Sequence, residues 1–129
     1  MTPVFLSLDH VLRTHRSLIE TYGGEEGLRD AGLLQSAIAM PMATYGGEFL
    51  HADMYEMAAA YLFHITQNHP FLDGNKRTGA ACAVIFLAMN GVEIDADEDA
   101  LVDITLRVAT GKAGKPEIAA FFRSDAHSD

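Results

Sequence analysis

Residues 74–90 read GNKRTGAACAVIFLAMN, and this stretch decides the fold. From Ala80 to Met89 it is apolar on most faces of a helix, so we predict a central helix that is buried all round. Gly91 follows Asn90 and suits the left-handed residue that commonly ends a helix. A helix of this composition must be covered by other elements, so the rest of the chain must supply segments that pack around it.

The segments upstream of this stretch show helical spacing as well. Apolar residues recur at helical intervals over residues 8–22, and Gly23 ends that segment. Asp30 is suited to cap a second, short helix. Asp53 is suited to cap a strong helix that carries alanines and large apolar residues through Ile65.

Downstream, the pattern predicts two more helices. Acidic residues at 95–99 precede an apolar series that ends near Gly111, and acidic groups stabilise the start of a helix. Pro116 fits the first position of a last short helix. Neither repeats nor linker-like stretches occur, so residues 1–129 are predicted to form a single domain.

The stretch Met42–His51 does not follow the helical pattern. Tyr45 precedes the pair Gly46 and Gly47, and further apolar residues follow, as in a short hairpin or extended flap. We expect His51, at the end of this flap, to be an ordinary surface histidine. The sequence therefore predicts an all-α fold, a compact bundle of about six helices with one short β-like flap.

The net charge restricts the classes of partner. The formal charge is -9, and an acidic surface repels nucleic acid, so direct DNA or RNA binding is not expected. Only nine Lys and Arg residues occur, and Lys76 and Arg77 are adjacent. Such a pair can bind a compact anion such as a nucleotide phosphate, although charge alone favours two solvated surface side chains.

Cysteine usage and hydropathy indicate a compartment. Cys82 is the only cysteine, so the chain cannot form an intrachain disulfide, which fits a reducing environment. Because Cys82 lies in an apolar run, we expect it to be an unreactive residue of the core. The longest apolar run, residues 80–89, is shorter than the roughly 20 residues of a membrane span. We expect a soluble cytoplasmic protein without membrane contact.

Residues 69–79 read HPFLDGNKRTG and lie at the entry to the central helix. The first N–H groups of a helix lack intrahelical partners and, with the helix dipole, form an anion site. Gly74 permits close approach of a ligand to the backbone, and the Asn75 amide can donate a hydrogen bond. This junction is therefore a candidate phosphate cradle.

Four further side chains supply the parts that phosphoryl or nucleotidyl transfer requires. Arg77 offers a planar fork of donors, and Lys76 offers a mobile point charge. Asp73 is a hard oxygen ligand for Mg²⁺, and His69 can exchange a proton near neutral pH. Taken one at a time, these residues also have ordinary explanations: His69 as a histidine at a helix end, Asp73 as a turn residue, and Arg77 as half of a surface ion pair. The prediction therefore depends on the residues occurring together in this order.

His69 through Arg77 resembles the signature of the Fic/Doc family, HxFx(D/E)(G/A)N followed by (G/K)R. The form with lysine, residues 75–78, is similar to the Doc (death on curing) branch. The resemblance runs from about Leu28 to Gly91, and residues 27–37 also look like Doc-family sequence. It implies a single Fic-like domain over the whole chain.

The resemblance assigns a role to each residue of the loop. His69 would be the general base for a target hydroxyl, and Asp73 would hold Mg²⁺. Gly74 and Asn75 would form the anion cradle, with Arg77 on a phosphate of the co-substrate ATP. The resemblance also implies roles for Phe71 and for residues of the flap.

Phe71 would lock the loop into the core. Tyr45, Gly46 and Gly47 would belong to a flap that aligns the target peptide by strand addition. Lys76 stands where Fic enzymes carry glycine, and Ala80 where they carry a second arginine. In the Doc branch that lysine accompanies a reversed nucleotide pose, which implies phosphorylation rather than adenylylation.

The implied activity is that of a toxin. The implied target is a threonine of elongation factor Tu, whose modification would halt translation. Self-inhibited Fic proteins carry (S/T)xxxE(G/N), but the candidates Thr21–Glu25 and Thr44–Glu48 are followed by Glu26 and Phe49. Restraint would therefore come from a separate Phd-like antitoxin. The alternatives are AMP transfer and a non-catalytic binding module.

Overall fold

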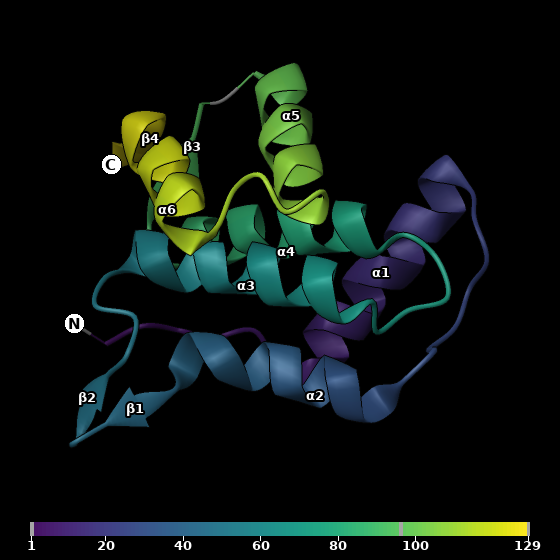
Figure 1. Ribbon diagram of the computed structural model, residues 1–129, viewed down its shortest axis with the longest axis horizontal. Coiled ribbons are helices and arrows are strands. Elements are labelled where there is room, and N and C mark those ends of the chain that lie inside the picture. The colour runs from purple at the N-terminus through teal and green to yellow at the C-terminus, as the bar shows by residue number, and fades with distance from the viewer. Residues whose placement is uncertain (1, 96, 129) are drawn as a thin grey trace.

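The computed structural model describes residues 2–95 and 97–128 and confirms the all-α bundle (Figure 1). The helices are α1 (Leu8–Tyr22), α2 (Ala31–Ala39), the 3₁₀ turn η1 (Met40–Met42), α3 (Met54–Asn68), α4 (Asn75–Met89), α5 (Glu98–Ala109) and α6 (Lys115–Ser124). The strands are β1 (Thr44–Tyr45), β2 (Glu48–Phe49), β3 (Val92–Ile94) and β4 (Ala126–Ser128). Within the described ranges, no helix has both the length and the apolar content to cross a bilayer.

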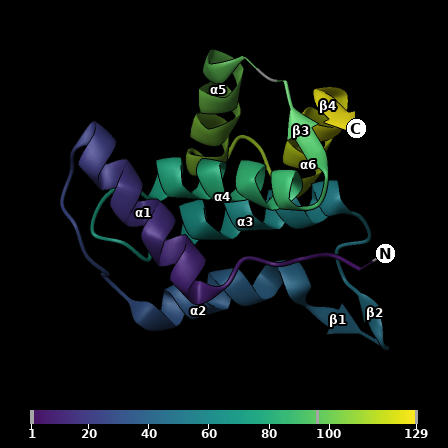
Figure 2. The same cartoon turned by 180° about the vertical axis from the view of Figure 1, so that it is seen from behind.

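Helices α3 and α4 lie side by side at the centre, and the other helices cover them. Helix α2 packs on one side of α3, while α5 and α6 pack on the other (Figure 1). Seen from behind, α1 runs across one end of this central pair and packs against α4 (Figure 2). The loop that joins α3 to α4 lies at the same end, which places it beside α1.

The helix starts follow the capping residues in the sequence. The Asp30 carboxylate accepts a hydrogen bond from the Leu33 N–H at 2.9 Å, and the Asp53 carboxylate accepts one from the Glu56 N–H at 2.8 Å. Both caps were predicted. Gly91, with φ of 84°, follows the end of α4 in the left-handed conformation that glycine adopts at little cost.

Helix α4 is not buried all round, contrary to the prediction. Cys82 and Phe86 lie on its buried face, and burial raises the pKa of the Cys82 thiol to about 12, as expected for an inert core cysteine. Ala80 and Ala81 are only half-buried and Met89 is exposed. An apolar composition does not reveal which face of a helix its neighbours leave uncovered. Here Ala80 and Ala81 lie on that uncovered face and line a pocket between α1 and α5.

Helices α3 and α4 come into close contact at Gly79. A Cβ atom at this position would lie 3.0 Å from the Leu62 carbonyl oxygen and 3.0 Å from Thr66 Oγ1. Real Cβ atoms rarely come this near to another atom, so glycine lets the two backbones touch. This contact fixes the spacing of the two helices that the site loop connects.

The flap prediction is confirmed as a hairpin. Strands β1 and β2 pair antiparallel, with Thr44 opposite Phe49, and Gly46 and Gly47 turn between them with φ of 61° and 83°. A second antiparallel pair, β3 with β4, was not predicted. Three-residue strands more than thirty positions apart leave no local pattern in the sequence.

His51 is buried, and the expectation of a surface histidine is wrong. Its side chain is 6% exposed, and its Nε2 lies 3.3 Å from Lys115 Nζ. The same ammonium lies 3.1 Å from His64 Nε2, so both imidazoles accept hydrogen bonds from it. The helix that covers His51 begins 64 residues later, which no local pattern could indicate.

This cluster makes folding stability depend on pH. Burial, then the Lys115 charge, lowers the pKa of His64 to about 4. Between pH 4 and the unfolded value of 6.5, the unfolded chain binds more protons, so the free energy of unfolding falls as pH drops through that window. Because His64 is only half-buried, we expect a loss of about 1–2 kcal/mol. Urea titrations from pH 7.5 to 4 measure it.

The matched variants are His64→Gln, which keeps a hydrogen-bond acceptor, and His10→Gln at a half-buried position on α1. The first should flatten the pH profile between 6.5 and 4, while the second should leave it unchanged. A His64→Gln profile parallel to that of the native chain would contradict this account.

Candidate active site

The loop between α3 and α4 is bracketed by two left-handed residues. His69 ends α3 with φ of 48° and ψ of 54°, and Gly74 precedes α4 with φ of 77° and ψ of 19°. His69 is the one non-glycine residue with positive φ in the described ranges. For an L-residue this conformation costs roughly 1–2 kcal/mol. Surrounding contacts must therefore hold His69 in place.

A strand-like segment, residues 27–30, lies antiparallel to the loop. The Leu72 N–H donates to the Gly27 carbonyl at 3.0 Å, and the Arg29 N–H donates to the Pro70 carbonyl at 2.7 Å. These bonds form a short β-bridge between chain segments about forty residues apart. The sequence singled out residues 27–37 by family likeness alone, and the structure places residues 27–30 of that stretch directly against the loop.

Phe71 anchors the loop in the core. Its side chain is 1% exposed and stacks on the His15 ring, with centroids 3.7 Å apart and planes 5° from parallel. His15 also donates from Nε2 to the Asp73 carbonyl at 2.8 Å. The Asn75 side chain bonds both backbone groups of Phe71. Its oxygen accepts a hydrogen bond from the Phe71 N–H at 2.9 Å, and its nitrogen donates one to the Phe71 carbonyl at 3.0 Å.

The Asn75 amide also defines the state of the His69 ring. Because Asn75 bonds a donor and an acceptor on Phe71, its oxygen and nitrogen cannot be exchanged. Its Nδ2 lies 3.3 Å from His69 Nδ1, which must therefore be the acceptor, so a neutral His69 carries its proton on Nε2. Asn75 is the first residue of α4 and is buried, and it lines the pocket at this helix start while its amide holds the loop.

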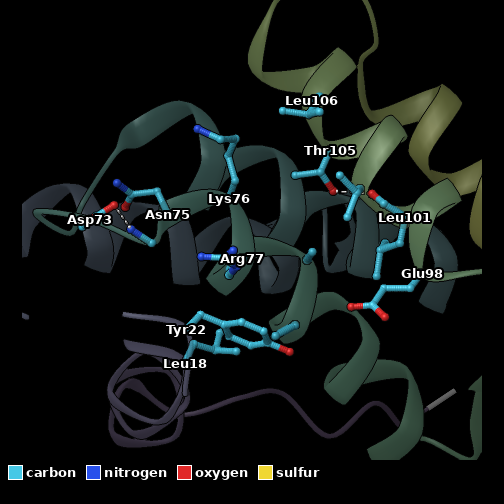
Figure 3. A pocket seen from close by; sticks show the side chains of 14 residues that line it. Leu18, Tyr22, Asp73, Asn75, Lys76, Arg77, Glu98, Leu101, Thr105 and Leu106 are labelled. Carbon is cyan, nitrogen blue, oxygen red and sulfur yellow. Dashed lines mark hydrogen bonds between the residues drawn. The ribbon is translucent and has the colours of Figure 1, made fainter. Parts of the chain in front are cut away.

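A pocket of about 570 Å³ opens at the N-terminus of α4 (Figure 3). One end of it is lined by the five consecutive residues Asp73, Gly74, Asn75, Lys76 and Arg77, which the sequence placed at this helix start. The backbone N–H groups of residues 75–77 find no acceptor in the described part of the chain. This end of the pocket combines free amide donors, two cations and the positive end of a helix dipole.

The remainder of the lining is mostly apolar. It comes from α1, the half-buried face of α4, and α5, and its residues are Leu18, Tyr22, Ala80, Ala81, Glu98, Leu101, Val102, Thr105 and Leu106. The Arg77 guanidinium stacks 4.6 Å from the centre of the Tyr22 ring. Within residues 2–95 and 97–128 neither Lys76 nor Arg77 has a carboxylate partner, which leaves both cations available to an anion.

Asp73 presents its carboxylate beside this cradle. Oδ1 accepts the Gly74 N–H at 2.8 Å and Oδ2 accepts the Glu25 N–H at 3.3 Å. The side chain is exposed, and each oxygen has further lone pairs to offer. In the described ranges, no three His, Cys, Asp or Glu side chains gather as a ready-made metal site.

The structure does not bring every predicted site residue together. His69 is exposed but does not line the pocket, and only the Asn75 side chain joins it to the cradle. Tyr45, Gly46 and Gly47 lie at the opposite end of α3 from His69 (Figures 1 and 2). The fifteen residues of α3, a helix about 22 Å long, lie between them.

Three residues of the site were missed by sequence reasoning. His15 and Tyr22 fall within the helical pattern of residues 8–22, and Arg29 falls within residues 27–37, but none of them was given a role. Helical spacing on residues 8–22 was the available signal for His15 and Tyr22. No local signal indicates that Arg29 reaches the end of α3, forty positions later.

Comparison with known proteins gives consistent matches. A family model described as the Fic/DOC family matches residues 5–87. The chain is 43% identical over 101 residues to "Toxin Doc" of Mycolicibacterium smegmatis, covering 77% of this chain and 78% of that protein. It is 33% identical over 114 residues to "Protein kinase doc" of Escherichia phage P1, covering 88% and 89% of the two chains.

Proposed function

Because the chain belongs to the Fic/DOC family, we propose that it is a Doc-like toxin that transfers the γ-phosphoryl group of Mg-ATP to a protein hydroxyl. The observation that carries the proposal is the anion cradle at the start of α4. This cradle lies at one end of a pocket large enough for a nucleotide. It contains the free N–H groups of the helix start, Gly74, and the cations Lys76 and Arg77, which have no carboxylate partner among the described residues. Preorganised donors of this kind stabilise the charge that develops on a transferred phosphoryl group.

The residues present fit a magnesium ion. Asp73 provides one exposed hard carboxylate beside the cradle, and Mg²⁺ at phosphate-transfer sites takes one or two carboxylates, with phosphate oxygens and water as further ligands. A bound magnesium ion would neutralise negative charge on the phosphates. We propose that Asp73 holds it, while Lys76 and Arg77 orient the nucleotide.

His69 is the proposed general base. In the neutral ring the unprotonated nitrogen is Nδ1, which receives the proton of the acceptor hydroxyl. The contact from Asn75 at 3.3 Å is long for a hydrogen bond, so a hydroxyl can replace it at small cost. The exposure of His69, which lies on the same loop as the cradle residues, leaves room for a protein substrate to approach.

The proposed partners are a protein acceptor and an antitoxin. By the family resemblance, the acceptor is a threonine of elongation factor Tu, and a Phd-like antitoxin restrains the toxin in trans. A target strand added to the hairpin at Tyr45 would be separated from His69 by the length of α3, about 22 Å, which an extended peptide spans in about seven residues. The hairpin would therefore contact the target far from the acceptor hydroxyl.

The decisive experiment is a transfer assay with purified chain, elongation factor Tu and Mg²⁺, run in parallel with α- and γ-labelled ATP. We expect label from the γ position alone. Label from the α position would establish AMP transfer despite Lys76. Tight ATP binding without any labelled acceptor would favour a non-catalytic binding module or another target.

A binding measurement tests the magnesium assignment separately. Asp73→Asn keeps an oxygen that can accept the Gly74 N–H. This variant should bind ATP about as weakly in Mg²⁺ as in EDTA, whereas the native chain should bind more tightly in Mg²⁺. Equal stimulation by Mg²⁺ in both proteins, measured by calorimetry, would remove Asp73 from the metal site.

A further inference from the structure

We propose that Arg29 is a positioning residue that sets the orientation of His69 for proton transfer. This inference rests on the proposed function, in which His69 accepts the hydroxyl proton. Arg29 precedes α2, forty positions before His69 in sequence, and its guanidinium reaches the C-terminal end of α3.

The guanidinium bonds the last two carbonyls of that helix end. Nε donates to the His69 carbonyl at 2.6 Å, and Nη2 donates to the Asn68 carbonyl at 2.9 Å. The terminal carbonyls of a helix lack intrahelical partners and carry its negative dipole charge, so a cation that forks across two of them is well matched. The backbone N–H of the same residue donates to the Pro70 carbonyl, which fixes the base of the side chain.

This contact acts where the backbone needs support. His69 occupies a left-handed conformation that an L-residue adopts only at a cost, and its own carbonyl is the group that Arg29 binds at the shorter distance. Loss of the guanidinium would let the peptide unit after His69 rotate. Among the described residues, the one other hydrogen-bond contact of the imidazole is the long one from Asn75, so the ring would then lose its direction.

Arg29 has no competing role in the described part of the chain. No carboxylate lies within ion-pair distance of it, and it does not line the nucleotide pocket. A change at this position should therefore affect proton transfer without affecting ATP binding. An ordinary surface arginine would affect neither.

The test uses Arg29→Ala and Arg29→Lys, with Arg13→Ala as the matched control. Arg13 is an exposed arginine whose ion pair is with Asp9 on the same helix. We expect Arg29→Ala to lower kcat by about 10–100-fold, with KM and Kd for ATP within about twofold of the native values. Lysine keeps the charge but cannot fork across two carbonyls, so Arg29→Lys should give an intermediate kcat. Arg13→Ala should match the native chain.

Unchanged kcat in Arg29→Ala, or a parallel loss of ATP affinity, would overturn the inference. NMR of the histidine rings gives a readout that needs no acceptor. The His69 ring signals should shift or broaden in Arg29→Ala, while those of His10 on α1 stay in place. If the native chain transfers nothing, the proposed function fails. The ring signals then decide the positioning role alone, and an unaltered His69 spectrum would refute it.

Discussion

Replacing His69 with asparagine is expected to lower the rate of transfer by about 10²–10⁴-fold, the usual contribution of a general base. Asparagine removes the titratable nitrogen but tolerates the left-handed backbone of this position better than alanine does. The fold and the pocket should therefore survive. Initial rates with γ-labelled ATP measure the loss, and growth of cells that express the variant should recover in parallel.

The control is His10→Asn, a half-buried position on α1 outside the candidate site, which should keep the native rate. Calorimetry should show that His69→Asn binds Mg-ATP as the native chain does, because His69 does not line the pocket. Full activity in His69→Asn would remove this residue from the mechanism. Lost ATP affinity would mean that the ring belongs to the nucleotide site instead.

Replacing Phe71 with alanine is expected to reduce the free energy of unfolding by about 3–5 kcal/mol, the usual range for a buried Phe. The ring is fully buried, it stacks on His15, and the Asn75 amide bonds the backbone of the same residue. A domain of this size has only about 5–15 kcal/mol of stability. Phe71→Ala should thus unfold at markedly lower urea concentration.

The neighbouring Leu72 offers a matched control because its side chain is 48% exposed. Leu72→Ala should change the stability by well under 1 kcal/mol, as exposed positions usually do. Similar urea midpoints for the two variants would show that Phe71 does not anchor the loop. Circular dichroism at several urea concentrations is sufficient for the comparison.

Local patterns predicted the fold where a single segment contained the whole signal. Asp30 and Asp53 sit next to the helices that they cap, and Gly46 and Gly47 sit inside the hairpin that they turn. The failures involve distant partners. His51 is covered by a lysine 64 positions away, which the sequence around the histidine cannot reveal.

The candidate site shows the same division. The residues of the cradle were predicted because a helix start and its first turn are contiguous in sequence, and the structure places them together. Chain order already places the hairpin before α3 and His69 after it, so the two lie at opposite ends of that helix. The contact of Arg29 was not predicted, since its partner is the end of a helix forty residues later and depends on how the segments pack.

The contact at Gly79 has a consequence for reading genome sequences. Any side chain there would meet the Leu62 backbone, so α3 and α4 would have to move apart. The loop that carries His69 and Asp73 connects these two helices, so its two ends would move apart as well. A related gene could therefore retain every letter of the HxFxDGN pattern and still encode an inactive protein. Position 79 belongs with that pattern whenever such genes are sorted into active and decayed copies.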